Sequence, residues 1–432
     1  MPLPTRRAVV AGAVGLLLVV VLPTGVGLPL WTALLVLAVV VDALAAPHPA
    51  RVEVARQLPA SVSLGSSAEL VTTVRVPRRT HLVELAEAAV PSLGLRERRR
   101  SVRPAPGRPA RVVTCCTPTR RGVLRSDGVT VRVHGPLGLG ARQGHLEEPL
   151  TLEVHPAFRS RGAAELRVRR ARLLEVGLRS TRGRGTGSEF DHLREYREGD
   201  EARRIDWGAT ARAGHPVVRT FRAERNQTVL LLVDTGRTMA GLVDGLPRLD
   251  HAMDAALALT TVATGVGDRV GMVAFADTVR ARVGTGNRPE QVARVARGLF
   301  TLEPVLAESA YREAFAATLA RQRRRSLLVL LTEVATEAVG ETLLPALPIL
   351  LARHEVVVAG VRDPAVDRWR HRAPADVDEA FLAASAARVG AERERTVALL
   401  RRAGARVVDA PPGELAGRLA DAYLDLKASG AL

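Results

Sequence analysis

The chain has 432 residues, of which 47% are hydrophobic and 25% are charged, so it is expected to fold into two or three domains and is not a disordered chain. Its formal charge of +17 comes almost entirely from arginine, because Lys427 is the only lysine. Such charge can bind nucleic acid, but aromatic residues make up only 3% of the chain, and nucleic acid is therefore not an expected partner.

The N-terminal region contains two nearly charge-free stretches, residues 8–22 and 28–41, separated by PTGVG. We predict that residues 1–46 form two transmembrane helices, although each run is short against the ~20 residues of a membrane span. A cleaved signal peptide is the alternative for the first stretch, but no convincing small-residue cleavage site precedes the second. Arginines flank the pair on both sides, at Arg6, Arg7 and from Arg51 onward. The positive-inside rule then places both ends in the cytoplasm.

Residues 50–157 are predicted to form a small β-sandwich, because short alternating runs such as AELVTTVRV and GVTVRV are separated by Pro, Gly and Ser turns. Residues 51–150 contain 17 arginines and 8 acidic residues, a charge that suits an anionic membrane surface. The only cysteines, Cys115 and Cys116, are adjacent and give no metal-binding spacing. They are expected to be buried, reduced thiols.

Residues 158–226 are predicted to be a connector, with a helical AAELRVRRARLLEVGL followed by the glycine-rich RSTRGRGTGS. In residues 227–432, continuous apolar strands such as TVLLLVD, RVGMVAFAD, SLLVLLTEV and EVVVAGV alternate with helical stretches. This pattern predicts an open, doubly wound α/β domain, with a parallel sheet covered on both faces.

Three stretches are predicted to reach the carboxyl edge of this sheet: DTGRT after the first strand, ESAY before a helix, and TEV at the end of a central strand. An aspartate and hydroxyls gathered from separate loops are ligands that a hard divalent cation such as Mg²⁺ or Mn²⁺ accepts, and no other cofactor is expected.

This half of the chain resembles a von Willebrand factor A-type domain, whose metal site uses an Asp-x-Ser-x-Ser loop, a threonine and an aspartate. The resemblance implies four ligands, Asp234, Thr238, Ser309 and Glu333. Gly236 stands where the loop should carry a serine, and Glu333 is one methylene longer than the aspartate. Arg237 places a positive charge inside the loop, which opposes cation binding. The alternative is a metal-free site in which Asp234 only hydrogen-bonds to its neighbours.

The signature segment, residues 187–212, packs acids, arginines and three aromatic residues into GSEFDHLREYREGDEARRIDWGATAR. Phe190, Leu193 and Tyr196 are spaced for one face of a helix, which Gly199 can end, and Asp200 can cap the next short helix. Ile205 and Trp207 are predicted to form a buried anchor inside a lattice of Arg–carboxylate pairs, or alternatively an exposed docking face. The residues assigned to this brace or interface are Arg194, Tyr196, Gly199, Asp200, Arg203, Ile205, Asp206, Trp207 and Arg212.

An enzyme is the main alternative in a different functional class. A metal-dependent hydrolase or nuclease would use Asp234, Glu333 and Asp206. No serine or cysteine lies at a recognisable nucleophile elbow, and no catalytic residue is assigned. A basic nucleic-acid or anionic-lipid binder is the second alternative.

The signature segment together with VVRTFRAERNQTVLLLVDTGRTM closely resembles domain-of-unknown-function family 58, in which an LRxYxxGDxxRxIDWxxxAR-like block precedes a von Willebrand A-like domain. The resemblance extends to the membrane segments, the β-rich region and the α/β domain. It implies a non-enzymatic adaptor or co-chaperone that works beside a MoxR-type AAA+ ATPase. Such a protein would be a multi-pass protein of the bacterial cytoplasmic membrane with cytoplasmic C-terminal domains, and no small-molecule substrate is expected.

Overall fold

The computed structural model describes residues 2–21, 27–76, 81–181, 189–197, 200–222, 227–430 and 432. The chain divides into two compact units, Met1–His155 and Pro156–Leu432, and each is described by itself.

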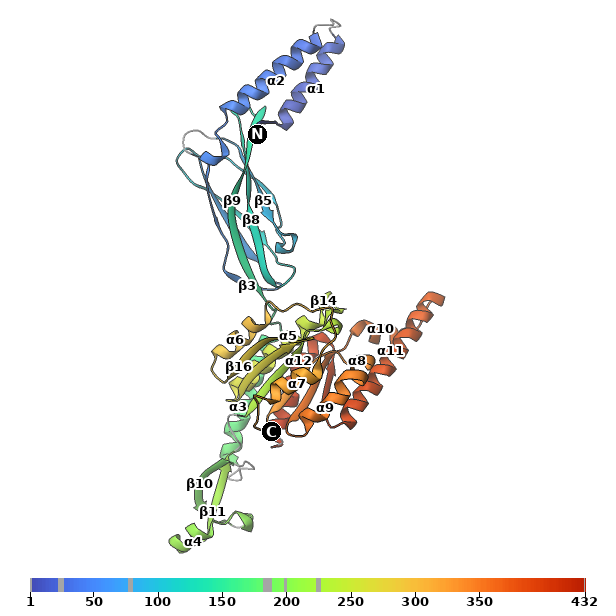
Figure 1. Ribbon diagram of the computed structural model, residues 1–432. Helices are drawn as coiled ribbons and strands as arrows, with labels where there is room; N and C mark the ends of the chain where they lie inside the picture. Colours follow the sequence, from blue (N-terminus) through green and yellow to red (C-terminus); the bar gives the residue numbers. More distant parts are fainter. Residues whose placement is uncertain are drawn as a thin grey trace. The chain divides into compact units, whose positions relative to one another are not determined.

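The first unit begins with two apolar helices, α1 (Arg6–Val21) and α2 (Gly27–Ala45), which pack side by side (Figure 1). A side chain at Gly15 would overlap the indole of Trp31, so the two helices approach closely there. Within the described residues, Gly27–Arg51 is long and apolar enough to cross a membrane, with a mean hydropathy of 2.2 over its most apolar stretch. Such a helix is typical of membrane-associated proteins. The shorter α1 does not meet this criterion, so one of the two predicted spans is supported.

The rest of the first unit is built from two sheets that enclose an apolar core, and their strand pairs are antiparallel except for the parallel pair of β3 with β9. The larger sheet has the order β1-β9-β8-β5-β6, with β3 paired to β9, and the smaller has the order β2-β4-β7. Valines from both sheets, including Val54, Val74, Val83 and Val131, share this core. The strands are β1 (Pro2–Pro4), β2 (Glu53–Gln57), β3 (Ser61–Ser63), β4 (Ala68–Arg75), β5 (Val83–Ala89), β6 (Arg99–Val102), β7 (Ala110–Cys116), β8 (Gly122–His134) and β9 (Gly140–His155), with short 3-10 helices η1 (Pro49–Arg51) and η2 (Pro91–Leu93).

Asp42 joins α2 to the turn between β8 and β9. Its carboxylate is 2% exposed and accepts backbone N–H groups of Leu137, Leu139 and Gly140 at 2.8, 2.7 and 2.8 Å. A side chain at Gly140 would overlap the α2 backbone, so glycine allows this close approach. The three hydrogen bonds offset the cost of burying the Asp42 carboxylate, and they fix α2 to the sheet.

The cysteine prediction is half wrong. Cys116 is buried, whereas Cys115 is exposed. Both lie in β7, where successive side chains point to opposite faces of the sheet, so neighbours in a strand cannot both face one core. Burial raises the pKa of the Cys116 thiol, which keeps it protonated and unreactive.

The second unit is built on a six-stranded sheet of order β16-β15-β12-β17-β18-β19. All neighbouring strands are parallel except β16, which pairs antiparallel with β15. Strand β16 was not predicted, because its exposed, arginine-containing face lacks the continuous apolar run of the other strands. The strands are β12 (Thr228–Asp234), β15 (Arg269–Phe275), β16 (Val279–Gly286), β17 (Leu327–Leu331), β18 (Glu355–Val361) and β19 (Arg406–Ala410), and β13 (Leu242–Val243) and β14 (Leu246–Pro247) form a separate small hairpin.

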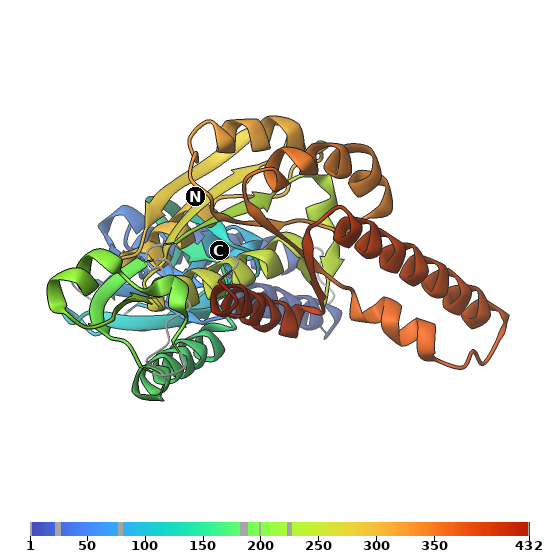
Figure 2. The same ribbon diagram turned by 90° about the horizontal axis from the view of Figure 1, so that it is seen from below.

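Helices cover both faces of this sheet, as the sequence predicts. One buried cluster joins the sheet to α3, α5, α6 and α12, and the other joins it to α7, α9 and α11. Figure 2 shows α10 and α11 side by side, and the two helices pack against each other. The helices are α3 (Arg161–Thr181), α5 (Arg248–Gly265), α6 (Glu290–Leu299), α7 (Tyr311–Leu319), α8 (Thr336–Ala338), α9 (Leu344–Leu351), α10 (Pro364–His371), α11 (Val377–Arg402) and α12 (Pro412–Ala428), with η4 (Arg237–Ala240) and the π-helical η5 (Val339–Leu343).

The single lysine has a structural partner that the sequence did not reveal. Lys427 Nζ lies 2.5 Å from Asp268 Oδ1, and Tyr423 donates its hydroxyl to Asp268 Oδ2 at 2.6 Å. Asp268 is fully buried, so this pair and hydrogen bond fix the last helix to the start of β15.

Candidate functional site

The carboxyl edge of the parallel sheet gathers the residues that the sequence singled out. Asp234 ends β12, whose neighbours on either side are β15 and β17, so strand order reverses at this point. Ser309 lies two residues before the first residue of α7, and Thr332 follows β17. In open sheets of this kind, binding sites lie in the crevice at such a reversal.

Asp234 is fully buried, and both of its carboxylate oxygens accept hydrogen bonds. Oδ1 accepts the Gly236 N–H at 2.8 Å and the Ser309 hydroxyl at 2.5 Å. Oδ2 lies 2.9 Å from the Tyr311 hydroxyl and 2.6 Å from the Thr332 hydroxyl. The carboxylate is therefore surrounded by donors from four separate positions in the chain.

Tyr311 is a member of this network that the sequence analysis did not assign. Its hydroxyl also lies 2.8 Å from Thr332 Oγ1. The hydroxyl groups of Tyr311 and Thr332 therefore have two protons for three short contacts, which are the two to Asp234 Oδ2 and the one between them. Burial and the nearby charge of Asp234 raise the pKa of Tyr311 well above its ordinary value. Tyr311 thus remains a neutral donor to Asp234 at physiological pH.

Glu333 lies between two guanidinium groups. Arg393 Nη1 donates to Glu333 Oε1 at 2.6 Å, and Arg248 Nε forms an ion pair with Oε2 at 3.0 Å without hydrogen-bond geometry. Arg393 also donates to both oxygens of Asp409, at 3.0 and 2.7 Å. The charge of Glu333 is therefore compensated by arginine.

Two opposing effects act on the half-buried Arg393. Burial alone lowers its pKa, but the hydrogen bonds and charges of Asp409 and Glu333 outweigh burial and raise the pKa above its ordinary value. The group is charged at any physiological pH, and it holds Glu333 in place as a permanent counter-ion.

The predicted metal ligands do not fit a divalent cation as they are placed. Asp234 and Ser309 are brought together, but they bind each other, and Glu333 is held by arginines. Thr238 lies in η4, beside an exposed Arg237 that pairs with Glu308 at 3.0 Å. Within the described ranges no three His, Cys, Asp or Glu side chains are grouped as metal ligands. A cation here would have to displace donors already bound to Asp234.

Gly236 explains how the loop closes without the expected serine. A Cβ atom at this position would lie 2.1 Å from Ser309 Oγ, so the Ser309 hydroxyl occupies the space of a side chain at 236. The glycine and Ser309 are therefore complementary, and together they supply one hydroxyl to Asp234.

We expect Gly236→Ser to lower the free energy of unfolding by about 1–2 kcal/mol, because it forces Ser309 away from Asp234. Adding Ser309→Ala should recover most of this loss, since the new hydroxyl then has room to bond to Asp234. Urea unfolding of the two single variants and the double variant measures this coupling. Additive losses would show that the two positions do not share this space.

The signature segment differs from its predicted secondary structure. Residues expected to be helical form strand β10 (Glu189–Glu195), paired antiparallel with β11 (Val217–Arg222). The apolar spacing suits a helix, but the partner strand VVRTFR is rich in strand-forming residues and lies more than 20 residues further along the chain. Helix periodicity within one segment cannot reveal such a partner.

The loop of this hairpin holds the predicted arginine–carboxylate pairs. Arg194 donates two hydrogen bonds of 2.7 Å to Asp200, which also accepts the Arg197 N–H at 2.9 Å. Asp200 was expected to cap the next short helix, but the N-cap residue of that helix, Ala202–Arg204, is Glu201. Gly199 lies outside the described residues.

Asp206 caps the short helix in the loop of this hairpin. It accepts the Ala209 N–H at 2.9 Å at the start of α4 (Trp207–Ala213), and its other oxygen accepts Arg219 Nε at 2.8 Å. The Ala209 hydrogen bond, followed by that of Arg219, lowers the pKa of Asp206. Its oxygens are thus used structurally, which weakens the catalytic alternative. The short helix η3 (Ala202–Arg204) includes Arg203, Ile205 pairs with Val218, and Arg212 lies in the last turn of α4.

Trp207 is not buried, contrary to the predicted anchor. Its side chain is 72% exposed at the first position of α4. Asp206 must precede it to cap the helix, and Ile205 already contributes the strand contact with Val218, so Trp207 is left facing outward. The exposed ring contradicts the buried anchor, and the docking face stays a prediction.

A second exposed apolar surface lies on α11. Phe381 and Val377 are each 70% exposed. The nearby Trp369 is covered by Arg372, whose guanidinium carbon lies 5.2 Å from the ring centre. Phe381 is therefore a second aromatic residue of this unit that is about as exposed as Trp207.

Comparison with known proteins finds one family in the same part of the chain. The family described as "Protein of unknown function DUF58" matches residues 192–372. Uncharacterised proteins of Mycobacterium bovis and Mycobacterium tuberculosis are 30% identical over 182 residues, which is 42% of this chain and 56% of theirs. The chain thus spans about half the length of the curated relatives it matches.

Two solved structures show weaker likeness. The conserved hypothetical protein BatB of Bacteroides thetaiotaomicron is 16% identical with a TM-score of 0.33, over 47% of this chain and 100% of that one. An aerotolerance-related membrane protein of Bacteroides fragilis is 13% identical with a TM-score of 0.25, over 41% of this chain and 98% of that one. Scores this low do not establish a shared fold.

Proposed function

We propose that the chain is a membrane-anchored, non-enzymatic adaptor that presents a von Willebrand A-like domain to a MoxR-type AAA+ ATPase in the cytoplasm. The observation that carries this proposal is the 72% exposed Trp207 on an ion-paired hairpin within the family-matched region. A large aromatic side chain exposed on an ordered element is typical of a protein-binding hot spot.

The Asp234 network supports a role without catalysis. Its carboxylate is saturated by donors, and the carboxylates of Glu333 and Asp206 are paired with arginines. General acid–base or metal-assisted hydrolysis needs a carboxylate free to take a proton, a water or a cation. In this account the network closes the sheet edge and keeps the domain rigid for docking.

Recovery of partners from native membranes tests the proposal. Full-length tagged protein, solubilised in mild detergent, should co-purify with an AAA+ ATPase, and EDTA should not abolish this because no metal bridges the contact. Recovery of other known membrane assemblies in the same preparation, without any AAA+ ATPase, would count against the adaptor role.

The membrane topology has its own test, because the exposed Cys115 is a natural probe of the sandwich. With α1 and α2 as a hairpin and both ends cytoplasmic, a membrane-impermeant maleimide should label the protein only after spheroplasts are lysed. Cys115→Ser should remove the label, and Cys116→Ser should leave it, because Cys116 is buried. Labelling of intact spheroplasts would place the sandwich outside the cytoplasm.

A further inference from the structure

A basic groove lies where α1 meets the β-sandwich, within the first unit. It has a volume of about 1020 Å³ and is lined by the first turn of α1 together with β5, β6 and β8. Six arginines contribute to its walls, against a single carboxylate, Glu84. The arginines are Arg6, Arg7, Arg99, Arg100, Arg103 and Arg132.

Most of this charge is not used inside the protein. Arg132 donates to Gln143 at 3.1 and 2.8 Å, and Arg100 pairs with Glu97 at 3.0 Å. The side chains of the other four arginines have no hydrogen-bond or ion-pair partner within the described ranges. Glu84 lies 3.0 Å from His134 Nε2 and 3.8 Å from Arg132 Nη1, so it offsets the charge of one groove arginine at most. Several like charges left unpaired around one hollow attract an anion strongly.

The groove also has an apolar side. Val9 belongs to its wall and is 68% exposed, and on the same helix Val10 and Val14 are 63% and 53% exposed. On α2, Val41 and Leu44 are 56% and 58% exposed. An apolar surface of this kind suits acyl chains, and it begins where the arginines end.

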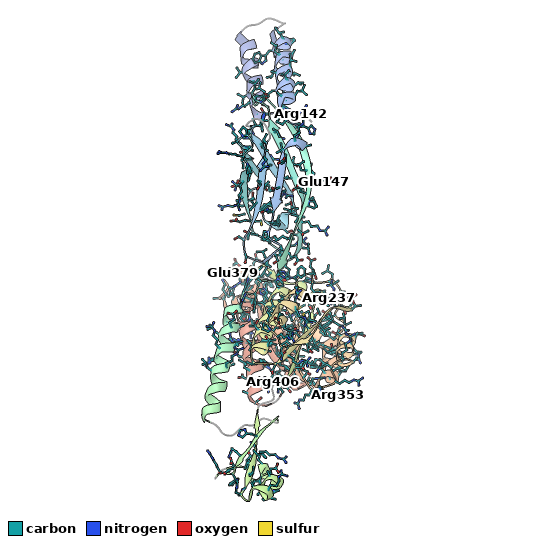
Figure 3. The ribbon with its side chains drawn as sticks, turned by 90° about the vertical axis from the view of Figure 1, so that its left-hand side faces the viewer. Arg142, Glu147, Arg237, Arg353, Glu379 and Arg406 are labelled. Carbon is teal, nitrogen blue, oxygen red and sulfur yellow. The ribbon has the colours of Figure 1, made fainter. Side chains whose placement is uncertain are left out.

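The groove therefore lies at the level where the apolar helices give way to the sandwich. Figure 3 labels Arg142 at the end of the sandwich next to these helices and Glu147 further along the same strand. Arginines outnumber the single carboxylate, Glu84, in the wall of the groove. In a membrane-anchored protein this is where the phospholipid headgroups lie.

We propose that this groove binds the headgroup of an anionic phospholipid, whose acyl chains lie along Val9 and Val10. The arginines would hold the phosphate by bidentate hydrogen bonds, which suit the planar guanidinium group. This inference rests on the membrane anchoring in the proposed function but not on the ATPase partner. Lipid would then fix the junction between the helices and the sandwich, next to the Asp42 contact.

The test is native mass spectrometry of the full-length protein in detergent, titrated with phosphatidylglycerol and, separately, with phosphatidylcholine. Wild type should bind phosphatidylglycerol at least tenfold more tightly. The variant Arg99→Gln/Arg103→Gln should lose most of this preference, because each arginine removed is expected to weaken phosphatidylglycerol binding about fivefold. The matched control Arg108→Gln/Arg111→Gln, exposed arginines of the same sandwich outside the groove, should keep it.

Equal binding of the two lipids, or equal losses in the two double variants, would overturn the proposal. Displacement of the lipid by millimolar inorganic phosphate or glycerol phosphate would show a site for free phosphate and would also overturn it. Carbonate extraction of native membranes separates this result from the anchoring claim. An inserted protein without lipid preference contradicts only the groove, whereas a protein released by carbonate contradicts the anchor.

Discussion

Replacing Asp234 with alanine is expected to lower the free energy of unfolding by about 3–5 kcal/mol. The buried donors on Gly236, Tyr311 and Thr332 would lose their acceptor, and each unsatisfied group costs about 1–3 kcal/mol. Urea unfolding of the Arg51–Leu432 fragment measures the loss. Because the role of Asp234 is hydrogen bonding, the loss should be the same in EDTA and in millimolar Mg²⁺.

Asp277 provides a matched control for this prediction. It lies near the same edge of the sheet but is exposed, and Asp277→Ala should change stability by no more than about 0.5 kcal/mol. If wild type is stabilised by Mg²⁺ and Asp234→Ala is not, the carboxylate binds a cation and the closed network is the wrong description of the site.

Trp207→Ala is expected to weaken binding of the partner by roughly 30- to 1000-fold, since an exposed tryptophan at the centre of an interface contributes about 2–4 kcal/mol. The same change should leave the free energy of unfolding within about 0.5 kcal/mol of wild type, because the ring is 72% exposed. Pull-down from native membranes and thermal unfolding of the same preparations measure the two effects.

Phe381→Ala is the control for exposed aromatic surface, because Phe381 is 70% exposed on α11 in the same unit. It should leave partner binding unchanged. Loss of binding in Phe381→Ala but not in Trp207→Ala would move the docking face to α11. A destabilisation of 3 kcal/mol or more in Trp207→Ala would show a buried ring.

The strand and helix pattern of the α/β domain was predictable because buried parallel strands are continuous apolar runs. Strand β12 and helix α5 follow TVLLLVD and the helical stretch beginning at Arg248. The edge strand β16 was missed, since it alternates exposed arginines with half-buried residues and is the antiparallel member of the sheet. Its identity depends on pairing with β15, which local sequence does not encode.

The candidate site, too, was predictable in part. The sequence placed Asp234 and Ser309 together, because both follow from the position of strand ends in a parallel sheet. Tyr311 and Arg393 were not predicted, because their contacts depend on side-chain direction and on a helix 60 residues away from Glu333. Likewise, the sequence left Trp207 as either a buried anchor or an exposed docking residue, whereas in the structure it follows the Asp206 cap and is exposed.

The most direct test of the adaptor account is the affinity of full-length protein in nanodiscs for a purified MoxR-type ATPase from the same organism, measured in EDTA without nucleotide. We expect saturable binding by wild type and by Phe381→Ala, and binding at least 30-fold weaker by Trp207→Ala. Absence of saturable binding by wild type, or equal affinity of wild type and Trp207→Ala, would contradict docking through the Trp207 hairpin.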